Sequence, residues 1–366
     1  MMQTEMILNG IGCDCFYKAV ASIMAYNGEL ENMFSFVGYD FIYEHQAYLE
    51  FSLSMQPQDY FKNYGLLYFE HDPNSTCSND YLRHVHDRLK GRRSLFQRII
   101  DLSQQGGIDS KEILAYTIHL LEEKKNIAIM LDPYPMREVY KFKGARCSSY
   151  PSEHYVVLFG YDKQNQTFLV VDNYFMFCGC IPTGLLLKAI DSLLELGKTI
   201  NMFTIIKSEE PIENKYELLL WSLREYMEDS LRINDRTYLK NTTAINALYN
   251  DWDDQITYAC EKFNEFAPQF LSYPYKDFRH QLNGLRSLVD MVFPNDIRLA
   301  ALSKALSKYS KQWKLFDMKL DLIAVKQEKI TDQRSELKNC LTRIIETEAT
   351  FMAQVMKLLD GNVKHV

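Results

Sequence analysis

The chain has 366 residues, of which 47% are apolar and 24% charged, so it has ordinary globular composition and length for one large or two medium domains. Its formal net charge of -7 argues against nucleic acid as a partner, because no field over the whole surface attracts a phosphate backbone. No window reaches the roughly 18 uninterrupted apolar residues that span a bilayer, and the N-terminus lacks the features of a signal peptide, so we expect a cytoplasmic protein without a membrane span.

The first helix is predicted at CFYKAVASIMAYNG. Phe16, Val20, Ile23 and Met24 recur there at helical spacing, and Gly28 is a typical C-terminal stop. Because Cys15 begins this segment, the pattern places a thiol at the start of a helix.

The rest of the first half alternates apolar runs with turns. A second helix is expected at SKEILAYTIHLLEEKKN, followed by strands at IAIMLDPYP, HYVVLFGYD, TFLVVDNYF and NMFTIIKS. The polar DKQNQ between the middle two strands predicts a hairpin. The sheet is therefore expected to be antiparallel near that hairpin.

The second half is helical for nearly its whole length. A charged and polar stretch around Pro211 is the expected linker, so an α+β domain of residues 1–210 precedes an all-α helical domain of residues 211–366. Apolar periodicity predicts helical segments at 214–232, 242–266, 275–292 and 295–313. Pro274 and Pro294 are expected to break the segments around them.

A long apolar stripe follows, with residues spaced by threes, fours and sevens. It consists of Leu320, Ile323, Ile330, Leu337, Leu341, Ile344, Phe351, Val355 and Leu358. We interpret the stripe as the core of a helical bundle, because its register is imperfect for a coiled coil. A separate dimeric coiled coil is the alternative, and the oligomeric state is open.

Cys15 is the candidate nucleophile. Unsatisfied backbone N–H groups and the helix dipole favour a thiolate at a helix start, and the preceding NGIGCD contains glycines that let the backbone turn sharply. Taken alone, the same position also suits a small buried apolar cysteine. Further residues have to distinguish the two interpretations.

His154 and Asp172 supply that distinction. His154 heads one strand of the predicted hairpin and Asp172 lies at the far end of the other, so the two residues are expected to be neighbours in space. A cysteine enzyme needs an imidazole to take the thiol proton and a carboxylate or amide to orient that imidazole. The chain order Cys, His, Asp therefore suggests a catalytic triad, although each residue alone is more often structural.

Four motifs carry a resemblance to a known family. They are CFYKAVASIMAYNG, the glycine- and aromatic-rich FSFVGYDFIY, the strand HYVVLFGYD and the strand end FLVVDNY, and they extend over roughly the first half of the chain. In this order they resemble the cysteine enzymes that share the N-terminal domain of BtrH, the acyltransferase of butirosin biosynthesis. The resemblance implies a papain-like fold with Cys15, His154 and Asp172 as the triad.

The resemblance also bears on three neighbouring positions. Papain-like enzymes place an amide six residues before the nucleophile in the oxyanion hole, which implies this role for Asn9, and a turn residue is the alternative. Two positions depart from the family pattern: Asp14 replaces the usual His before the cysteine, and Asn173 replaces the usual Pro after the aspartate. Both departures are compatible with a changed substrate or with lost activity.

The expected function is acyl transfer through a thioester on Cys15. By the resemblance, the acyl or aminoacyl group arrives on an acyl or peptidyl carrier protein and leaves on an amine of a small-molecule natural-product intermediate. Hydrolysis by a thiol peptidase or amidase is one alternative, because only access of water or amine to the thioester separates the two outcomes. A non-catalytic interaction module is the other.

The cysteines also raise a metal interpretation. Eight cysteines are too few for a disulfide scaffold in a chain of this length, and we expect thiols or catalytic groups. Cys13-x-Cys15 and Cys178-x-Cys180 suggest a four-cysteine zinc site, but paired zinc ligands are generally separated by two or more residues. We therefore expect no metal and no other cofactor.

Overall fold

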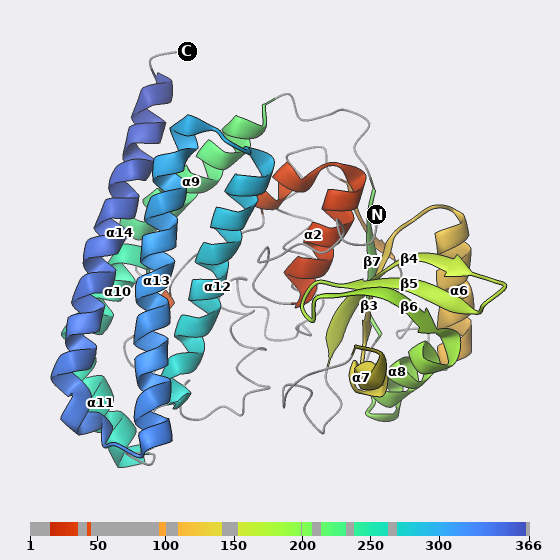
Figure 1. The fold of residues 1–366 in the computed structure, drawn as a ribbon, viewed down its shortest axis with the longest axis horizontal. Coiled ribbons are helices and arrows are strands. Elements are labelled where there is room, and N and C mark those ends of the chain that lie inside the picture. Colours follow the sequence, from red (N-terminus) through yellow and green to blue (C-terminus); the bar gives the residue numbers. More distant parts are fainter. Residues whose placement is uncertain are drawn as a thin grey trace. The chain divides into compact units, whose positions relative to one another are not determined.

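A computed structural model describes the protein in nine segments. They are residues 15–35, 42–44, 95–99, 109–140, 153–198, 200–206, 214–231, 238–262 and 269–363. These segments form two compact units (Figure 1). The first runs from helix α2 (Cys15–Asn27) to strand β7 (Met202–Ile206), apart from β1 (Ile42–Glu44), which belongs to the second unit with β8 (Tyr238–Lys240) and the remaining helices.

The first unit is built on a six-stranded antiparallel sheet in the order β2-β7-β3-β4-β5-β6. The further strands are β2 (Leu95–Ile99), β3 (Ile127–Leu131), β4 (His154–Asp162), β5 (Thr167–Asp172) and β6 (Phe177–Pro182). The predicted hairpin is confirmed, because β4 pairs with β5 in antiparallel register. Asp162 fixes its turn by accepting hydrogen bonds from the backbone N–H groups of Gln164 and Asn165 at 2.9 and 3.1 Å.

Helices cover both faces of this sheet (Figure 1). The helices α6 (Ser110–Glu122) and α8 (Thr183–Glu195) share one core with alternate residues of the strands, among them Val156 and Met202. On α2, the Phe16 ring packs edge-on against Tyr155 and at a tilt against Phe203, at centroid distances of 5.4 and 5.1 Å. Since neighbouring strand residues point to opposite faces, α2 lies on the other side of the sheet.

The first unit also contains short helical turns and elements that the sequence did not predict. The turns are η1 (Leu30–Ser35), η3 (Tyr134–Met136) and α7 (Arg137–Tyr140). Strand β6 and helix α8 were not predicted, nor was β2. A strand of the composition FCGCIP lacks the alternation that identifies a half-buried strand, so local pattern gave no signal for β6.

The second unit is mainly helical. Among the described residues its helices are α9 (Lys215–Leu231), α10 (Asn241–Asn250), α11 (Trp252–Lys262), α12 (Gln269–Val292), α13 (Ile297–Lys326) and α14 (Arg334–Val363), with a short turn η4 (Ile330–Gln333). Helix α13 packs between α12 and α14 (Figure 1). Along the part of the chain that the structure describes, no helix combines the length and apolar character needed to cross a membrane.

The predicted apolar stripe lies in the core of this unit, which supports a helical bundle. Eight of its nine residues are at most 2% exposed, and Leu358 is half-buried. The stripe does not form one helix, because Gln327 adopts a left-handed conformation with φ of 54° and ends α13. Buried Ile330 in η4 continues the apolar spacing across the connection, so periodicity alone does not reveal the break.

Two other expectations for the helical half were wrong. Pro274 lies inside α12, whose C-terminal half buries Leu282, Leu285 and Leu288 in the core and so offsets the lost backbone hydrogen bond. The unit is also not all-α, because β1 pairs with β8 in a short antiparallel sheet. Its two strands are far apart in sequence, and no local pattern reveals such a pair. The break expected at Pro294 is confirmed between α12 and α13.

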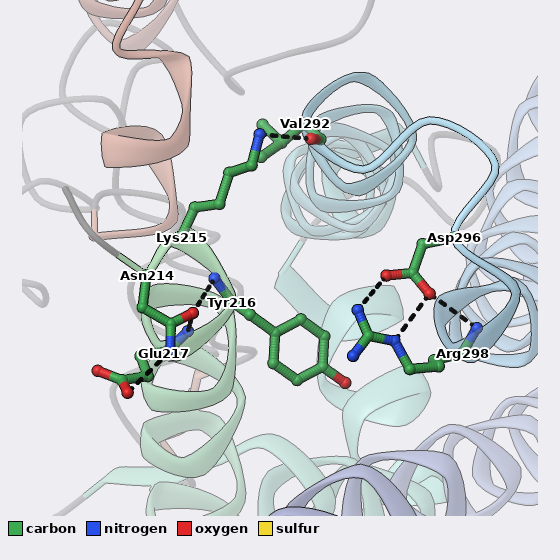
Figure 2. Close-up of polar contacts among 7 residues, drawn as sticks. All are labelled: Asn214, Lys215, Tyr216, Glu217, Val292, Asp296 and Arg298. Carbon is green, nitrogen blue, oxygen red and sulfur yellow. Dashed lines mark hydrogen bonds and ion pairs between the residues drawn. The ribbon is translucent and has the colours of Figure 1, made fainter. Parts of the chain in front are cut away.

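The start of α9 is fixed to the turn between α12 and α13 (Figure 2). Lys215 Nζ donates to the Val292 carbonyl at 3.3 Å, which satisfies an acceptor at the C-terminus of α12. The Arg298 guanidinium lies over the Tyr216 ring at 4.7 Å and pairs with Asp296 at 2.6 Å. These contacts connect α9 to the α12–α13 pair.

Glu348 of α14 is a buried carboxyl in the core of this unit, with 1% of its surface exposed. Tyr226 Oη donates to its Oε1 at 3.2 Å and Thr242 Oγ1 donates at 3.0 Å. Burial raises the pKa of Glu348 from 4.5 to about 7, although the hydrogen bonds from Thr242 and Tyr226 oppose the shift. The stabilisation that comes with this raised pKa is complete below about pH 4.5 and is lost as the pH rises to about 7.

We therefore expect Glu348→Gln to stabilise the helical unit at alkaline pH, because the amide has no charge to desolvate. The expected gain in unfolding free energy at pH 8 is about 2 to 3 kcal/mol, falling below about 1 kcal/mol at pH 5. Urea unfolding at both pH values measures it, with exposed Glu346→Gln on the same helix as the control. Equal gains in unfolding free energy at pH 5 and pH 8 would show that burial does not raise the pKa of Glu348.

Candidate active site

Cys15 is the first residue of α2 and is half-buried. The helix forms because its apolar residues, Phe16, Val20 and Ile23 among them, lie on one buried face against the sheet. It ends as predicted, since Gly28 has a φ of 76° and its N–H donates to the Ala25 carbonyl at 3.1 Å. The thiol thus stands where free backbone N–H groups favour negative charge.

His154 and Asp172 meet at one end of the β4–β5 hairpin. His154 is the first residue of β4 and Asp172 is the last residue of β5, with exposures of 5% and 1%. The imidazole Nε2–H donates to Asp172 Oδ2 at 2.7 Å, because a carboxylate only accepts. The buried carboxylate therefore fixes both the ring orientation and the proton on Nε2.

The carboxylate is itself held by the backbone that follows β5. Asp172 Oδ1 accepts hydrogen bonds from the N–H groups of Tyr174 and Phe175 at 3.0 and 3.1 Å. One carboxylate oxygen is thus occupied by the turn and the other by His154. An aspartate anchored in this way can orient an imidazole without moving itself.

Cys15 lies close enough to the His154 ring to contribute to the pKa of that ring. Because Asp172 occupies Nε2, the ring nitrogen left for the thiol is Nδ1. Burial alone lowers the pKa of His154, but the negative charges of Asp172 and Cys15 and their hydrogen bonds outweigh it and raise the pKa from 6.5 to about 10. The histidine beside Cys15 therefore holds its proton well above neutral pH.

Asn173 connects the end of β5 to α2. Its Nδ2 donates to Ser22 Oγ, and Ser22 Oγ donates to the Lys18 carbonyl at 2.7 Å. Asn173 and Ser22 are both buried, at 3% and 4% exposure. The asparagine thus links the strand that carries Asp172 to the helix that carries Cys15.

We expect Asn173→Ala to misplace the thiol relative to the imidazole. The change removes one buried hydrogen bond, so the unfolding free energy should fall by about 1 to 3 kcal/mol. The alkylation rate of Cys15 at pH 7 should fall about tenfold or more, because small displacements of reacting groups lower reaction rates strongly. Peptide mass mapping after timed alkylation measures this rate.

The matched control is Asn165→Ala, which removes an asparagine side-chain hydrogen bond from the exposed hairpin turn. This control should leave the alkylation rate of Cys15 unchanged. Equal rates in Asn173→Ala and wild type would mean that Asn173 stabilises the fold without positioning the thiol.

Two aromatic rings flank the imidazole. Phe175 lies 4.8 Å and Tyr174 5.4 Å from the His154 ring, measured between centroids. Tyr174 is 45% exposed, and Lys18 Nζ lies 5.1 Å from its ring centre. The rings shield the His154–Asp172 pair, while the Tyr174 edge of the site faces solvent.

Several predicted positions lie outside the described residues. These are Asn9, the proposed oxyanion donor, together with Cys13 and Asp14. Cys178 and Cys180 lie on β6 as free thiols. Across the described residues, His, Cys, Asp and Glu side chains do not gather in groups of three or more that could hold a metal ion.

The structure brings the three predicted residues together, whereas Ser22 and the contact that Asn173 makes with it were not predicted. Ser22 stands two helical turns after Cys15, and a serine on an otherwise apolar buried face is a signal for a specific partner. The link to Asn173 joins distant parts of the chain and leaves no local pattern.

Comparison with protein-family models and with curated proteins gave no match.

Proposed function

We propose that the first unit is a papain-like enzyme domain that transfers acyl groups through a thioester on Cys15. The observation that supports this most is the buried hydrogen bond between His154 and Asp172, with Cys15 beside the same imidazole at the start of α2. The carboxylate binds one ring nitrogen and the thiol faces the ring from a helix N-terminus. This arrangement is what nucleophilic catalysis by cysteine requires.

In the first half of the reaction, the thiol proton rests on His154 and the Cys15 thiolate attacks the carbonyl carbon of a thioester donor. The oxyanion that forms is stabilised by backbone N–H groups at the start of α2 and, by the resemblance, by Asn9. As the intermediate collapses, the donor thiol leaves and takes the proton from His154. The acyl group is now bound to Cys15 and the imidazole is neutral.

In the second half, an amine attacks the carbonyl carbon of this thioester. His154 accepts a proton from the amine, the carbon–nitrogen bond forms and the Cys15 thiolate leaves. The amide product is released and the thiolate–imidazolium pair is restored. Throughout, Asp172 holds Nε2 and stabilises the charged imidazole, whose raised pKa keeps it protonated in the resting state.

The substrate classes in this proposal come from the resemblance of the sequence motifs to those of the BtrH family. The donor is an acyl or aminoacyl group on a carrier protein, and the acceptor is an amine of a small natural-product intermediate. The same proposal places the reaction in the cytoplasm. The exposed Tyr174 edge beside His154 supports a site that a carrier-bound chain can reach from solvent.

Intact mass spectrometry of wild type and Cys15→Ser tests the proposal. Both proteins are incubated with acyl-carrier-protein thioesters and with small thioesters. We expect an acyl mass increase on wild type and none on Cys15→Ser. Addition of a primary amine to the isolated acyl-enzyme should release an amide.

Three other outcomes of this experiment would indicate a hydrolase, a binding module or a different nucleophile. Release of free acid alone, in the presence of amine, indicates a hydrolase that uses the same nucleophile. The absence of any adduct, together with an unreactive Cys15 thiol, indicates a binding module and overturns the proposal. An adduct that persists in Cys15→Ser would locate the chemistry elsewhere in the chain.

A further inference from the structure

Helix α13 carries an exposed apolar stripe at its C-terminal half. Leu315, Met318, Leu322 and Val325 are 43%, 52%, 43% and 80% exposed. Their spacing of three, four and three residues is that of a helix seam, which places all four on one side of α13. Trp313, Phe316 and Leu320 of the same helix are buried in the bundle core, so the stripe is separate from that core.

The same side of α13 is basic at its N-terminal half. Lys304, Lys308, Lys311 and Lys314 are all exposed. At about 100° per residue, these lysines and the four apolar residues fall within an arc of about 120°. Within the described residues none of the four lysines forms an ion pair, although the chain as a whole has a net charge of -7.

No acidic side chain of α13 lies on this side. The helix contains two acidic residues, Asp317 and Asp321, of which Asp317 is buried and pairs with Arg279 at 3.0 Å. Asp321 is half-buried and lies outside the arc. The exposed side of α13, called the α13 face below, thus changes from basic to apolar along its length without a negative group.

We propose that the α13 face is the docking surface for an acidic amphipathic helix of a partner protein. Contiguous exposed apolar residues bordered by charge mark interaction surfaces, and a helix laid along another helix buries such a seam. The partner presents carboxylates to Lys304, Lys308 and Lys311 and apolar side chains to the Leu315–Val325 stripe. The face is about 32 Å long, which matches a partner helix of about six turns.

The charges of α13 disfavour a second copy of the same helix as the occupant. In a parallel pair the lysines of the two copies would face each other. In an antiparallel pair aligned on the apolar stripe, which is centred near residue 320, Lys304, Lys308 and Lys311 would lie beyond Lys326, where α13 of the other copy ends. In either arrangement, α13 of the other copy places no carboxylate opposite the basic half.

Fluorescence anisotropy with the full chain tests the proposal. The probes are two labelled helical peptides of about 22 residues with glutamates on one half of a seam and leucines on the other, in the two possible orders. We expect one of them to bind saturably and to weaken as salt rises, because exposed charges are screened. A peptide with lysines in place of the glutamates should not bind.

Two double variants locate the binding. Leu315→Glu with Leu322→Glu, and Lys308→Glu with Lys311→Glu, should each weaken binding about tenfold or more, and the second should instead bind the lysine peptide. All four positions are exposed, so folding measured by circular dichroism should be unchanged. Leu196→Glu and Lys188→Glu, exposed positions on the first unit, are the matched controls and should bind as wild type does.

Three results would overturn the proposal. One is the absence of saturable binding by both acidic peptides, as expected if the chain itself covers the α13 face. Another is equal binding by wild type and by the two double variants. The third is a wild-type dimer in sedimentation that becomes a monomer in Leu315→Glu with Leu322→Glu, which would identify a second copy as the occupant.

Discussion

Cys15→Ala is expected to abolish thioester turnover while leaving the protein folded. The substitution removes the sulfur atom that forms the proposed covalent intermediate, so the loss should be at least about 10⁴-fold, the scale on which enzymes lose activity without their nucleophile. Alanine is the strongest helix former, and Cys15 is a half-buried terminal residue of α2. The measurement is initial release of free thiol from the thioester that gives the most acyl-enzyme.

The control for this prediction is Cys180→Ala, which removes an exposed thiol from β6. It should turn over thioesters at the wild-type rate. Turnover by Cys15→Ala within a few fold of wild type, with its folding confirmed, would exclude Cys15 as the nucleophile.

Substitutions at Asp172 should have the second largest effect, and they should be graded. Asp172→Ala leaves the buried Nε2–H of His154 without its acceptor, so both the orientation and the raised pKa of His154 are lost. We expect turnover to fall about 10³- to 10⁴-fold, because loss of the residue that orients a catalytic histidine costs up to about 10⁴-fold in turnover. Asp172→Asn keeps an oxygen for the imidazole and should lose about tenfold to 10²-fold.

Thermal unfolding separates this catalytic effect from lost stability, because Asp172 also accepts hydrogen bonds from the Tyr174 and Phe175 backbone. Both variants are assayed well below their unfolding temperatures. Asn173→Ala, which weakens the neighbouring link to α2, serves as a reference for a positional change alone. Equal turnover by Asp172→Ala and wild type would show that the His154–Asp172 pair is structural.

The central residues could be predicted because each stands at a position that local pattern defines. Gly28 marks the end of the helix that Cys15 begins, and the DKQNQ turn defines the hairpin whose ends hold His154 and Asp172. Hairpin topology then brings the two ends together without any knowledge of the remaining fold. In the structure, His154 Nε2 and Asp172 Oδ2 lie 2.7 Å apart.

The remaining features depend on contacts between distant segments. The Asn173–Ser22 hydrogen bond joins β5 to α2, and β1 pairs with a strand from the second half of the chain. Local sequence carries no record of either partner. Gln327 likewise ends α13 within the apolar stripe of Leu320 to Leu358, although glutamine rarely marks a helix end. The buried Ile330 supports the turn that follows, and this is a tertiary contact.

The most direct test of the account compares two thiols in one molecule. Wild type is treated with limiting iodoacetamide at pH 6, and alkylation of Cys15 and of the more exposed Cys180 is followed by peptide mass mapping. We expect Cys15 to react faster than Cys180, and His154→Ala to reverse this order, because the imidazole holds the thiol proton and stabilises the thiolate. If Cys15 reacts more slowly than Cys180 in both proteins, then His154 does not activate the thiol and the proposed catalytic role of Cys15 is contradicted.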